Sequence, residues 1–141
     1  MPYIIGRDAT LLTPLPSYLA MAASFVGMQL VGDFGLYWGH RIQHTVPRLW
    51  ELHRIHHRLE TPTPMSTIFI HPVDATLQGG LPILLAAAAI RPHPILFYLY
   101  VWLRVAENVV NHSGLDGSFI VSLLTLKFLP FRASIAHHDY Q

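Results

Sequence analysis

A stretch of 22 residues, Tyr18 to Gly39, contains only one charged residue, Asp33. Because a helix rises about 1.5 Å per residue, a helix of this length can cross the hydrocarbon core of a bilayer. The composition agrees, since 52% of the residues are hydrophobic, 12% are charged and the mean hydropathy is +0.37. A water-soluble domain of this size does not need so apolar a composition for its core. We therefore expect an all-α, integral membrane helical protein.

The remaining pattern predicts further helices and short connectors. The first helix is expected to continue past Gly39 and to end at Thr45, because Pro47 disfavours helix at the residue before it. A second helix is predicted for residues 48–58, an extended connector for 60–64 and a β-prone segment for 66–70. Two apolar runs, 75–90 and 94–103, are expected to form a membrane hairpin, with helix continuing towards Asn111. We expect residues 119–130 to lie at the interface, and no linker or repeat divides the single domain 1–141.

The types of charged and metal-binding residue exclude several functions. The chain has no cysteine, which rules out disulfides, iron–sulfur clusters and thiolate metal sites. It has ten histidines, so a metal site has to use nitrogen and oxygen ligands. A net charge of +1 without a basic stripe argues against a nucleic-acid partner.

Five histidines form two clusters within 18 residues. His40 and His44 are four residues apart and therefore share one face of the first predicted helix. His53 precedes His56 and His57 by three and four residues, which are also helical spacings. More than four imidazoles exceed the needs of one tetrahedral zinc ion, so the pattern predicts a site for two metal ions.

Other candidates lie further along the chain. The predicted hairpin returns to the face of the clusters before His112, which makes His112 a further candidate metal ligand. His138 is the last candidate, in a histidine-rich run at the end of the chain. His93, in the turn of the hairpin, is expected to be an interfacial anchor. We assign supporting or uncertain roles, such as hydrogen bonding to a ligand, to Asp33, His71, Glu107, His137 and Asp139.

The distribution of basic residues predicts the orientation in a membrane. Two of the nine Lys and Arg residues, Arg7 and Arg91, fall on the side opposite the histidines. By the positive-inside rule, the histidine side faces the cytosol. The basic residues expected on that side are Arg41, Arg48, Arg54, Arg58, Arg104, Lys127 and Arg132.

These motifs resemble those of the fatty acid hydroxylase/sterol desaturase superfamily of integral-membrane di-iron enzymes. Its motifs His-x-x-x-His and His-x-x-His-His correspond to residues 40–44 and 53–57, and the resemblance covers roughly residues 25 to 141. The 4-methylsterol oxidase subgroup is similar at Glu107 with 112–114 and, in part, at 137–140. Residues 61–64 with 71–78 are closer to sterol C-5 desaturases.

The resemblance implies an oxidoreductase, of the monooxygenase type, in lipid metabolism and sterol biosynthesis. It implies hydroxylation or desaturation of a C–H bond of a sterol-like lipid by O2, with two non-haem iron ions that zinc can replace in a preparation. It also implies a cytochrome b5-type electron donor and a multi-pass protein of the endoplasmic reticulum. Gln141 stands where the family has histidine, and the family usually has a further membrane hairpin upstream, so the resemblance implies a domain incomplete at both ends. Two other interpretations stay open, a catalytically inactive truncated paralogue that binds metal or partner proteins, and a membrane metal-transport protein.

Overall fold

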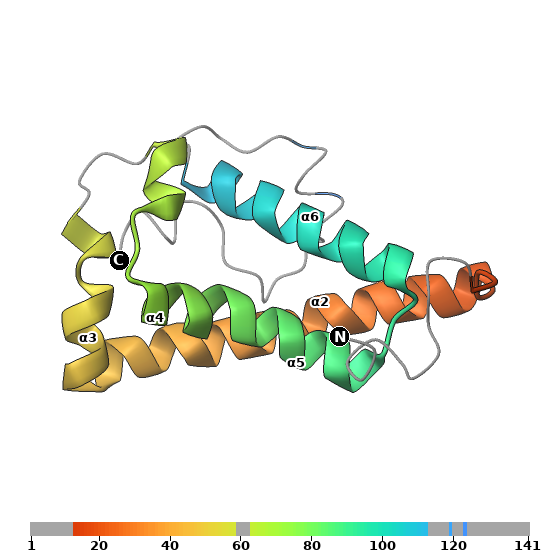
Figure 1. Ribbon diagram of the computed structural model, residues 1–141, viewed down its shortest axis with the longest axis horizontal. Coiled ribbons are helices and arrows are strands. Elements are labelled where there is room, and N and C mark those ends of the chain that lie inside the picture. Colours follow the sequence, from red (N-terminus) through yellow and green to blue (C-terminus); the bar gives the residue numbers. More distant parts are fainter. Residues whose placement is uncertain (1–12, 59–62, 113–118, 120–122, 124–141) are drawn as a thin grey trace. The chain divides into compact units, whose positions relative to one another are not determined.

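The computed structural model describes residues 13–58, 63–112, 119 and 123, and all regular secondary structure in them is helical. The all-α prediction is confirmed for this part of the chain. The chain divides into two compact units, residues 1–41 with 76–102 and residues 42–75 with 103–141, and each is described separately below. In chain order (Figure 1) the elements are α2 (Tyr18–Thr45), α3 (Pro47–His53), η1 (His56–Arg58), η2 (Pro64–Ile68), α4 (Pro72–Ala75), the π-helical turn η3 (Thr76–Gly80), α5 (Leu81–Ile90) and α6 (Pro94–Asn111).

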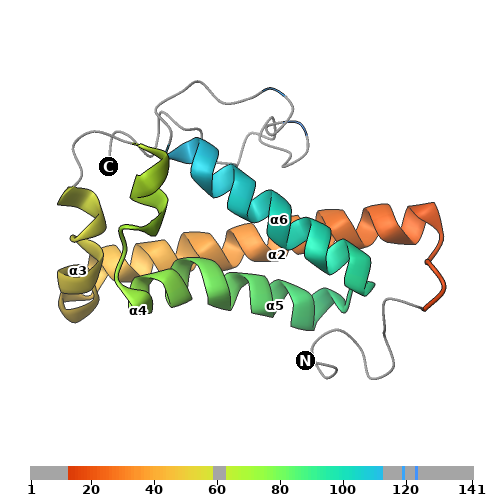
Figure 2. The same ribbon diagram turned by 45° about the horizontal axis from the view of Figure 1, so that its top comes forward.

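The core of the first unit forms where α2, α5 and the beginning of α6 pack together. Figures 1 and 2 both show α5 running alongside α2. Four side chains from these helices form a buried apolar cluster, Met28, Ala86, Leu96 and Tyr100. Phe25 and other partly buried side chains pack against that cluster. Burial of this apolar surface holds the three helices together.

Glycines on α2 permit its close approach to neighbouring segments of the first unit. A Cβ atom at Gly39 would lie 2.5 Å from the carbonyl oxygen of Leu77, in the π-helical turn. A Cβ at Gly32 would collide with the hydroxyl of Tyr100, which is fully buried. A larger residue at Gly39 therefore requires a shift of backbone, and one at Gly32 requires a shift of the buried Tyr100 side chain or of α2.

The outer faces of these helices are strongly apolar. By length and composition, α2 and the helical segment Pro72–Ile90 are each able to cross a membrane. In the most apolar 18 residues of each segment, only 17% are buried in α2 and 22% in Pro72–Ile90. A core helix of a soluble protein instead buries most of its apolar surface. Phe34, Leu85 and Trp102 are among the large apolar side chains left exposed. Such extensive exposure is typical of helices that contact lipid.

Prolines set several boundaries where the sequence predicted them. Helix α2 ends at Thr45, and Val46 is extended before Pro47, which begins α3. The turn between α5 and α6 comprises residues 91–93, and α6 extends to Asn111 as expected. Arg91 adopts a left-handed conformation, with φ of 51°, and donates its N–H to the carbonyl of Ala87 at the end of α5.

Two local predictions for the second unit were wrong. Residues 48–58 do not form one helix, because α3 ends at His53 and the chain tightens into the 3-10 turn η1. There the N–H of Arg58 bonds to the carbonyl of Ile55, three residues back, which is how 3-10 turns satisfy helix ends. The β-prone residues 66–70 are not extended either, since 64–68 form the 3-10 turn η2. A strand needs a neighbouring strand, and none stands beside this segment among the described residues.

Candidate metal centre

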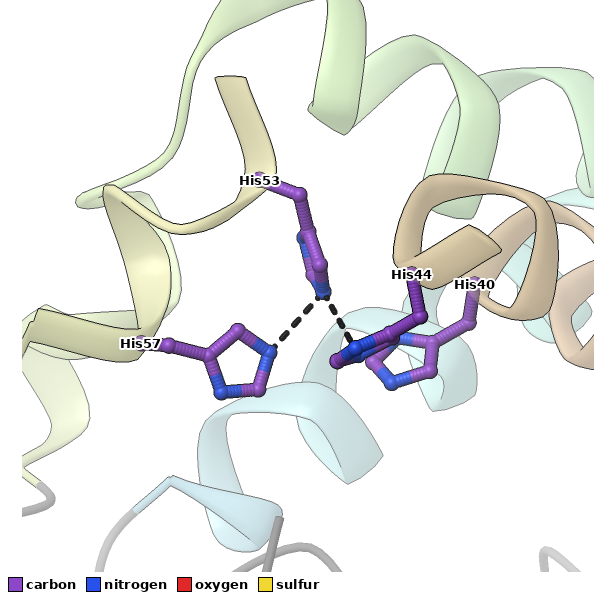
Figure 3. Close-up of side chains that lie close together, drawn as sticks. All are labelled: His40, His44, His53 and His57. Atoms are coloured by element: carbon purple, nitrogen blue, oxygen red, sulfur yellow. Dashed lines mark hydrogen bonds between the residues drawn. The ribbon is translucent and has the colours of Figure 1, made fainter. Parts of the chain in front are cut away.

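Four histidines bring their ring nitrogens together at the junction of three helical elements (Figure 3). His44 is near the end of α2, His53 is the last residue of α3, and His57 lies in η1. His40 stands one turn before His44 on the continuous helix α2 and joins them. One nitrogen from each residue lies within 4.8 Å of the others, a grouping able to hold a metal ion. We call these four residues the first histidine group.

His53 lies at the centre of the first histidine group. Its Nε2 atom is 3.2 Å from Nε2 of His44 and 2.9 Å from Nε2 of His57. Two nitrogens that bind one metal at about 2.0–2.1 Å and at right or tetrahedral angles lie about 2.8–3.4 Å apart. The observed spacing therefore fits a shared ion, and His53 itself is fully buried.

A second pair of histidines lies beside His53 and His57, within the second compact unit. His56 and His112 are both largely buried, and their Nε2 atoms are 3.1 Å apart. The ring of His56 is centred 6.1 Å from that of His53 and 5.8 Å from that of His57. These two residues are called the second histidine pair below.

The side chains of His56 and His57 belong to different groups, although the residues are adjacent. Successive residues of a helical turn point roughly 100–120° apart, because 3.0 to 3.6 residues complete one turn. His57 therefore faces His53 and His44, and His56 faces His112. The motif His-x-x-His-His thus supplies nitrogens to two neighbouring places.

The proton of His112 is fixed by the backbone. Its Nδ1 atom is 2.8 Å from the carbonyl oxygen of Asn108, which only accepts hydrogen bonds, so Nδ1–H donates. In the neutral ring Nε2 then carries a lone pair, and this atom faces His56. An unprotonated nitrogen in a buried place is the form of histidine that binds a metal.

His71 and His93 use their rings differently. Each precedes a proline that begins a helix, α4 after His71 and α6 after His93. Nδ1 of His71 accepts the backbone N–H of Val73, and Nδ1 of His93 accepts that of Ile95, both at 3.2 Å. Neutral His71 and His93 therefore carry the proton on Nε2, which in His93 donates to the carbonyl of Thr13. Both residues act as helix N-caps, and His71 is not in the first histidine group.

The other candidate residues are placed as follows. Glu107 is buried and accepts a hydrogen bond of 2.9 Å from Arg104, one turn earlier on α6. Asp33 is half-buried on α2 and lies outside the first histidine group. The terminal candidates His137, His138 and Asp139 lie outside the described residues. The metal-binding roles of all these residues remain predictions.

Sequence reasoning missed two polar residues, Asp74 and Gln43, which are both buried next to the histidines. Asp74 lies in the first turn of α4, and its two carboxylate oxygens lie 2.9 Å from Nδ1 of His53 and 3.0 Å from Nε2 of Gln43. Both side chains are 1% exposed. An acidic residue at the head of an apolar segment, and an amide beside His44, were the signals available.

The fold and the site define a helical protein that has strongly apolar helices and a candidate all-histidine metal centre. The family model for fatty acid hydroxylase matches residues 25–141, most of the chain. The chain therefore belongs to the fatty acid hydroxylase family, in the fatty acid hydroxylase/sterol desaturase superfamily, as its motifs indicated.

Curated relatives agree with this assignment. The chain is 33% identical over 127 residues to methylsterol monooxygenase 2-2 of Arabidopsis thaliana, covering 90% of this chain and 46% of the relative. It is also 33% identical over 127 residues to a very-long-chain aldehyde decarbonylase of Oryza sativa subsp. japonica, covering 90% of this chain and 40% of the relative. The chain thus spans less than half the length of these relatives. No solved structure matches it.

Proposed function

We propose that this chain forms the centre of a membrane-bound, O2-dependent oxidoreductase that holds two iron ions and oxidises a C–H bond of a lipid. The observation that carries the proposal is the presence of two adjacent sets of histidine nitrogens, the first histidine group and the second histidine pair. Their spacings suit two neighbouring metals, and membership of the fatty acid hydroxylase family supports iron.

Each set has its own task in the proposed centre. The first histidine group would hold one iron, and the second histidine pair would hold the other together with further ligands such as His138. Imidazole nitrogens suit iron. Because the chain has no cysteine, no thiolate competes with them for the metal. Bound iron supplies the activation of O2 and the oxidation of an unactivated C–H bond.

The protein's own residues orient these ligands and keep water away. His53, His56 and His112 are 0%, 9% and 8% exposed, so water has little access to their rings. The Trp50 ring lies 5.1 Å from that of His44, which is itself exposed, and shields one side of the first histidine group. A dry site strengthens the electrostatic interactions of a bound cation and limits side reactions.

The apolar helices support a position in a membrane. Tyr37 and Trp38 are exposed and lie near the end of the apolar part of α2. Arg41 donates a hydrogen bond of 3.0 Å to the Tyr37 hydroxyl, and its guanidinium lies 6.0 Å from the centre of the Trp38 ring. Aromatic residues with a neighbouring basic residue are typical of the boundary between lipid and water. We propose a multi-pass protein of the endoplasmic reticulum with its histidines on the cytosolic side.

The electron donor is proposed to be a cytochrome b5-type protein. Arg48, Arg54 and Arg58 are exposed near the first histidine group, where an acidic donor has a basic surface to dock. The same arginines suit lipid headgroups, so salt dependence of electron transfer distinguishes the two roles.

The relatives' names leave the lipid undecided, since a methylsterol monooxygenase and an aldehyde decarbonylase are equally similar. We propose a sterol-like lipid. The test supplies membranes holding the full chain with a reductase system, 18O2 and either a methylsterol or a very-long-chain aldehyde. Iron-dependent entry of one 18O atom into the sterol, with the other atom leaving as water and two electrons coming from the donor, supports the proposal. No product from either lipid while iron stays bound favours the inactive paralogue, and zinc flux through vesicles favours transport.

A further inference from the structure

Asp74 occupies the centre of a buried hydrogen-bond chain that joins α2, α4 and the end of α3. Nε2 of Gln43 donates to Oδ1 of Asp74 at 3.0 Å, and Oδ2 of Asp74 lies 2.9 Å from Nδ1 of His53. All three side chains are 0–1% exposed, so water does not compete for these contacts. The three residues belong to the same compact unit.

We propose that Asp74 and Gln43 are positioning residues that fix the ring and the proton of His53, so that Nε2 of His53 presents a lone pair to the metal. The inference rests on the proposed function, because it describes how a ligand of that centre is prepared. Neither residue belongs to the first histidine group, and each acts through His53.

The direction of the hydrogen bond follows from the chemistry of the carboxylate. An ionised carboxylate only accepts, so Nδ1 of His53 donates its hydrogen to Asp74. The neutral ring then has no hydrogen on Nε2, the atom that faces His44 and His57. In the opposite tautomer the hydrogen on Nε2 would stand where the ion binds. A carboxylate behind a ligating histidine commonly fixes the tautomer in this way and raises the basicity of the ring.

Gln43 fixes the carboxylate in turn. Its amide nitrogen faces Oδ1 of Asp74, and a flipped amide would instead place its oxygen against a carboxylate oxygen. The carboxylate therefore determines the orientation of the amide, and the amide restrains rotation of the Asp74 side chain. Because Gln43 precedes His44 on α2, this helix supplies both a candidate ligand and the anchor for the ligand on α3.

The chain offers a matched control on the same helix. Gln29 is also a glutamine of α2 with 1% exposure, and its side chain has no hydrogen-bond partner among the described residues. Gln29→Met and Gln43→Met make the same change in comparable burial. Only Gln43→Met removes a donor to Asp74.

The first measurement reads the tautomer directly in the metal-free full chain. The protein is labelled with 15N-histidine in lipid bilayers, and the His53 nitrogens are assigned by comparison with His53→Gln. We expect hydrogen on Nδ1 in the wild type and a mixture of tautomers in Asp74→Asn, since an amide offers one accepting atom where the carboxylate offers two. Hydrogen on Nε2 in the wild type, or an unchanged tautomer in Asp74→Asn, overturns the inference. The wild-type result decides the point even if Asp74→Asn does not fold.

The second measurement is the affinity for Zn(II), by competition with a chelator. We expect Asp74→Asn and Gln43→Met to bind roughly 10- to 100-fold more weakly, the usual loss when a group behind a metal ligand is removed. Gln29→Met should match the wild type. Equal losses in Gln43→Met and Gln29→Met assign the effect to packing and overturn the role of Gln43. If the wild type has the expected tautomer and affinity but oxidises no lipid, the proposed function fails while this inference stands.

Discussion

Replacing His71 tests whether this histidine caps a helix or binds metal. In His71→Ala the N–H of Val73 loses the acceptor that now stands 3.2 Å away, and α4 loses its N-cap. Loss of an N-cap side chain lowers the free energy of unfolding by about 1 kcal/mol, within a range of about 0.5–2. His71→Asn supplies an oxygen acceptor at the same position and should recover most of that stability. Unfolding of both variants in detergent, against the wild type, gives the two differences.

Metal affinity supplies the second half of the comparison. Both His71 variants should bind Zn(II) or Fe(II) as the wild type does, because the ring of His71 is outside the first histidine group. Loss of a group that only supports a metal ligand weakens metal binding by about 10- to 100-fold. His53→Asn removes a proposed ligand itself, so it should weaken binding by at least as much. That variant removes a nitrogen lying 2.9 and 3.2 Å from two others. A loss of metal in His71→Asn as large as that in His53→Asn would refute the distinction between cap and ligand.

Three further predictions follow from the packing, the topology and the second pair. Gly39→Ala should lower the free energy of unfolding by about 1–3 kcal/mol, because the new Cβ meets a backbone carbonyl oxygen at 2.5 Å. In Gly27→Ala the new Cβ meets only the end of a flexible side chain, at 2.9 Å. That variant should therefore lose less stability in the same unfolding assay. The chain has no cysteine of its own, so single cysteines can be placed at Arg91 and at Arg54. They should react with an impermeant thiol reagent from opposite sides of a vesicle. Labelling from the same side would show that the hairpin does not cross the membrane. His112→Asn should remove one of two bound irons and leave the other, and retention of both would exclude His112 as a ligand.

Features that depend on short spacings were predictable from the sequence. His40 and His44 are one turn apart in any helix, and the expected helix formed, so their proximity followed directly. The end of α2 followed from the restriction that Pro47 places on the residue before it. These features need only local rules, which hold whatever the chain packs against.

The general return of His112 to the clusters was predicted, but the individual side-chain pairs between distant residues were not. Asp74 contacts His53 and Gln43 across 21 and 31 residues, and no periodicity in the sequence reports such pairs. The division of His56 and His57 between two partners required the position of His112, 55 or more residues further on. The helical propensity of residues 48–58 likewise gave no sign of the tightening at η1.

The two His-Pro pairs show a different limit. His71-Pro72 and His93-Pro94 have the same local pattern, and in both the ring accepts a backbone N–H at the start of a helix. From the sequence, His71 was expected to have a supporting or uncertain role in the site, and His93 to be an interfacial anchor. The proline was the available signal, because proline is common at the first position of a helix and leaves the preceding residue as the N-cap.

The most direct test of the central claim is to count the irons and determine their separation in the full chain. Iron analysis combined with Mössbauer and X-ray absorption spectroscopy of the 57Fe-loaded protein reports stoichiometry, ligand type and metal–metal distance together. The account predicts two neighbouring irons per chain with nitrogen and oxygen ligands, and the loss of one iron in either His44→Gln or His112→Gln. A single isolated iron, or an iron content unchanged by both substitutions, would contradict it.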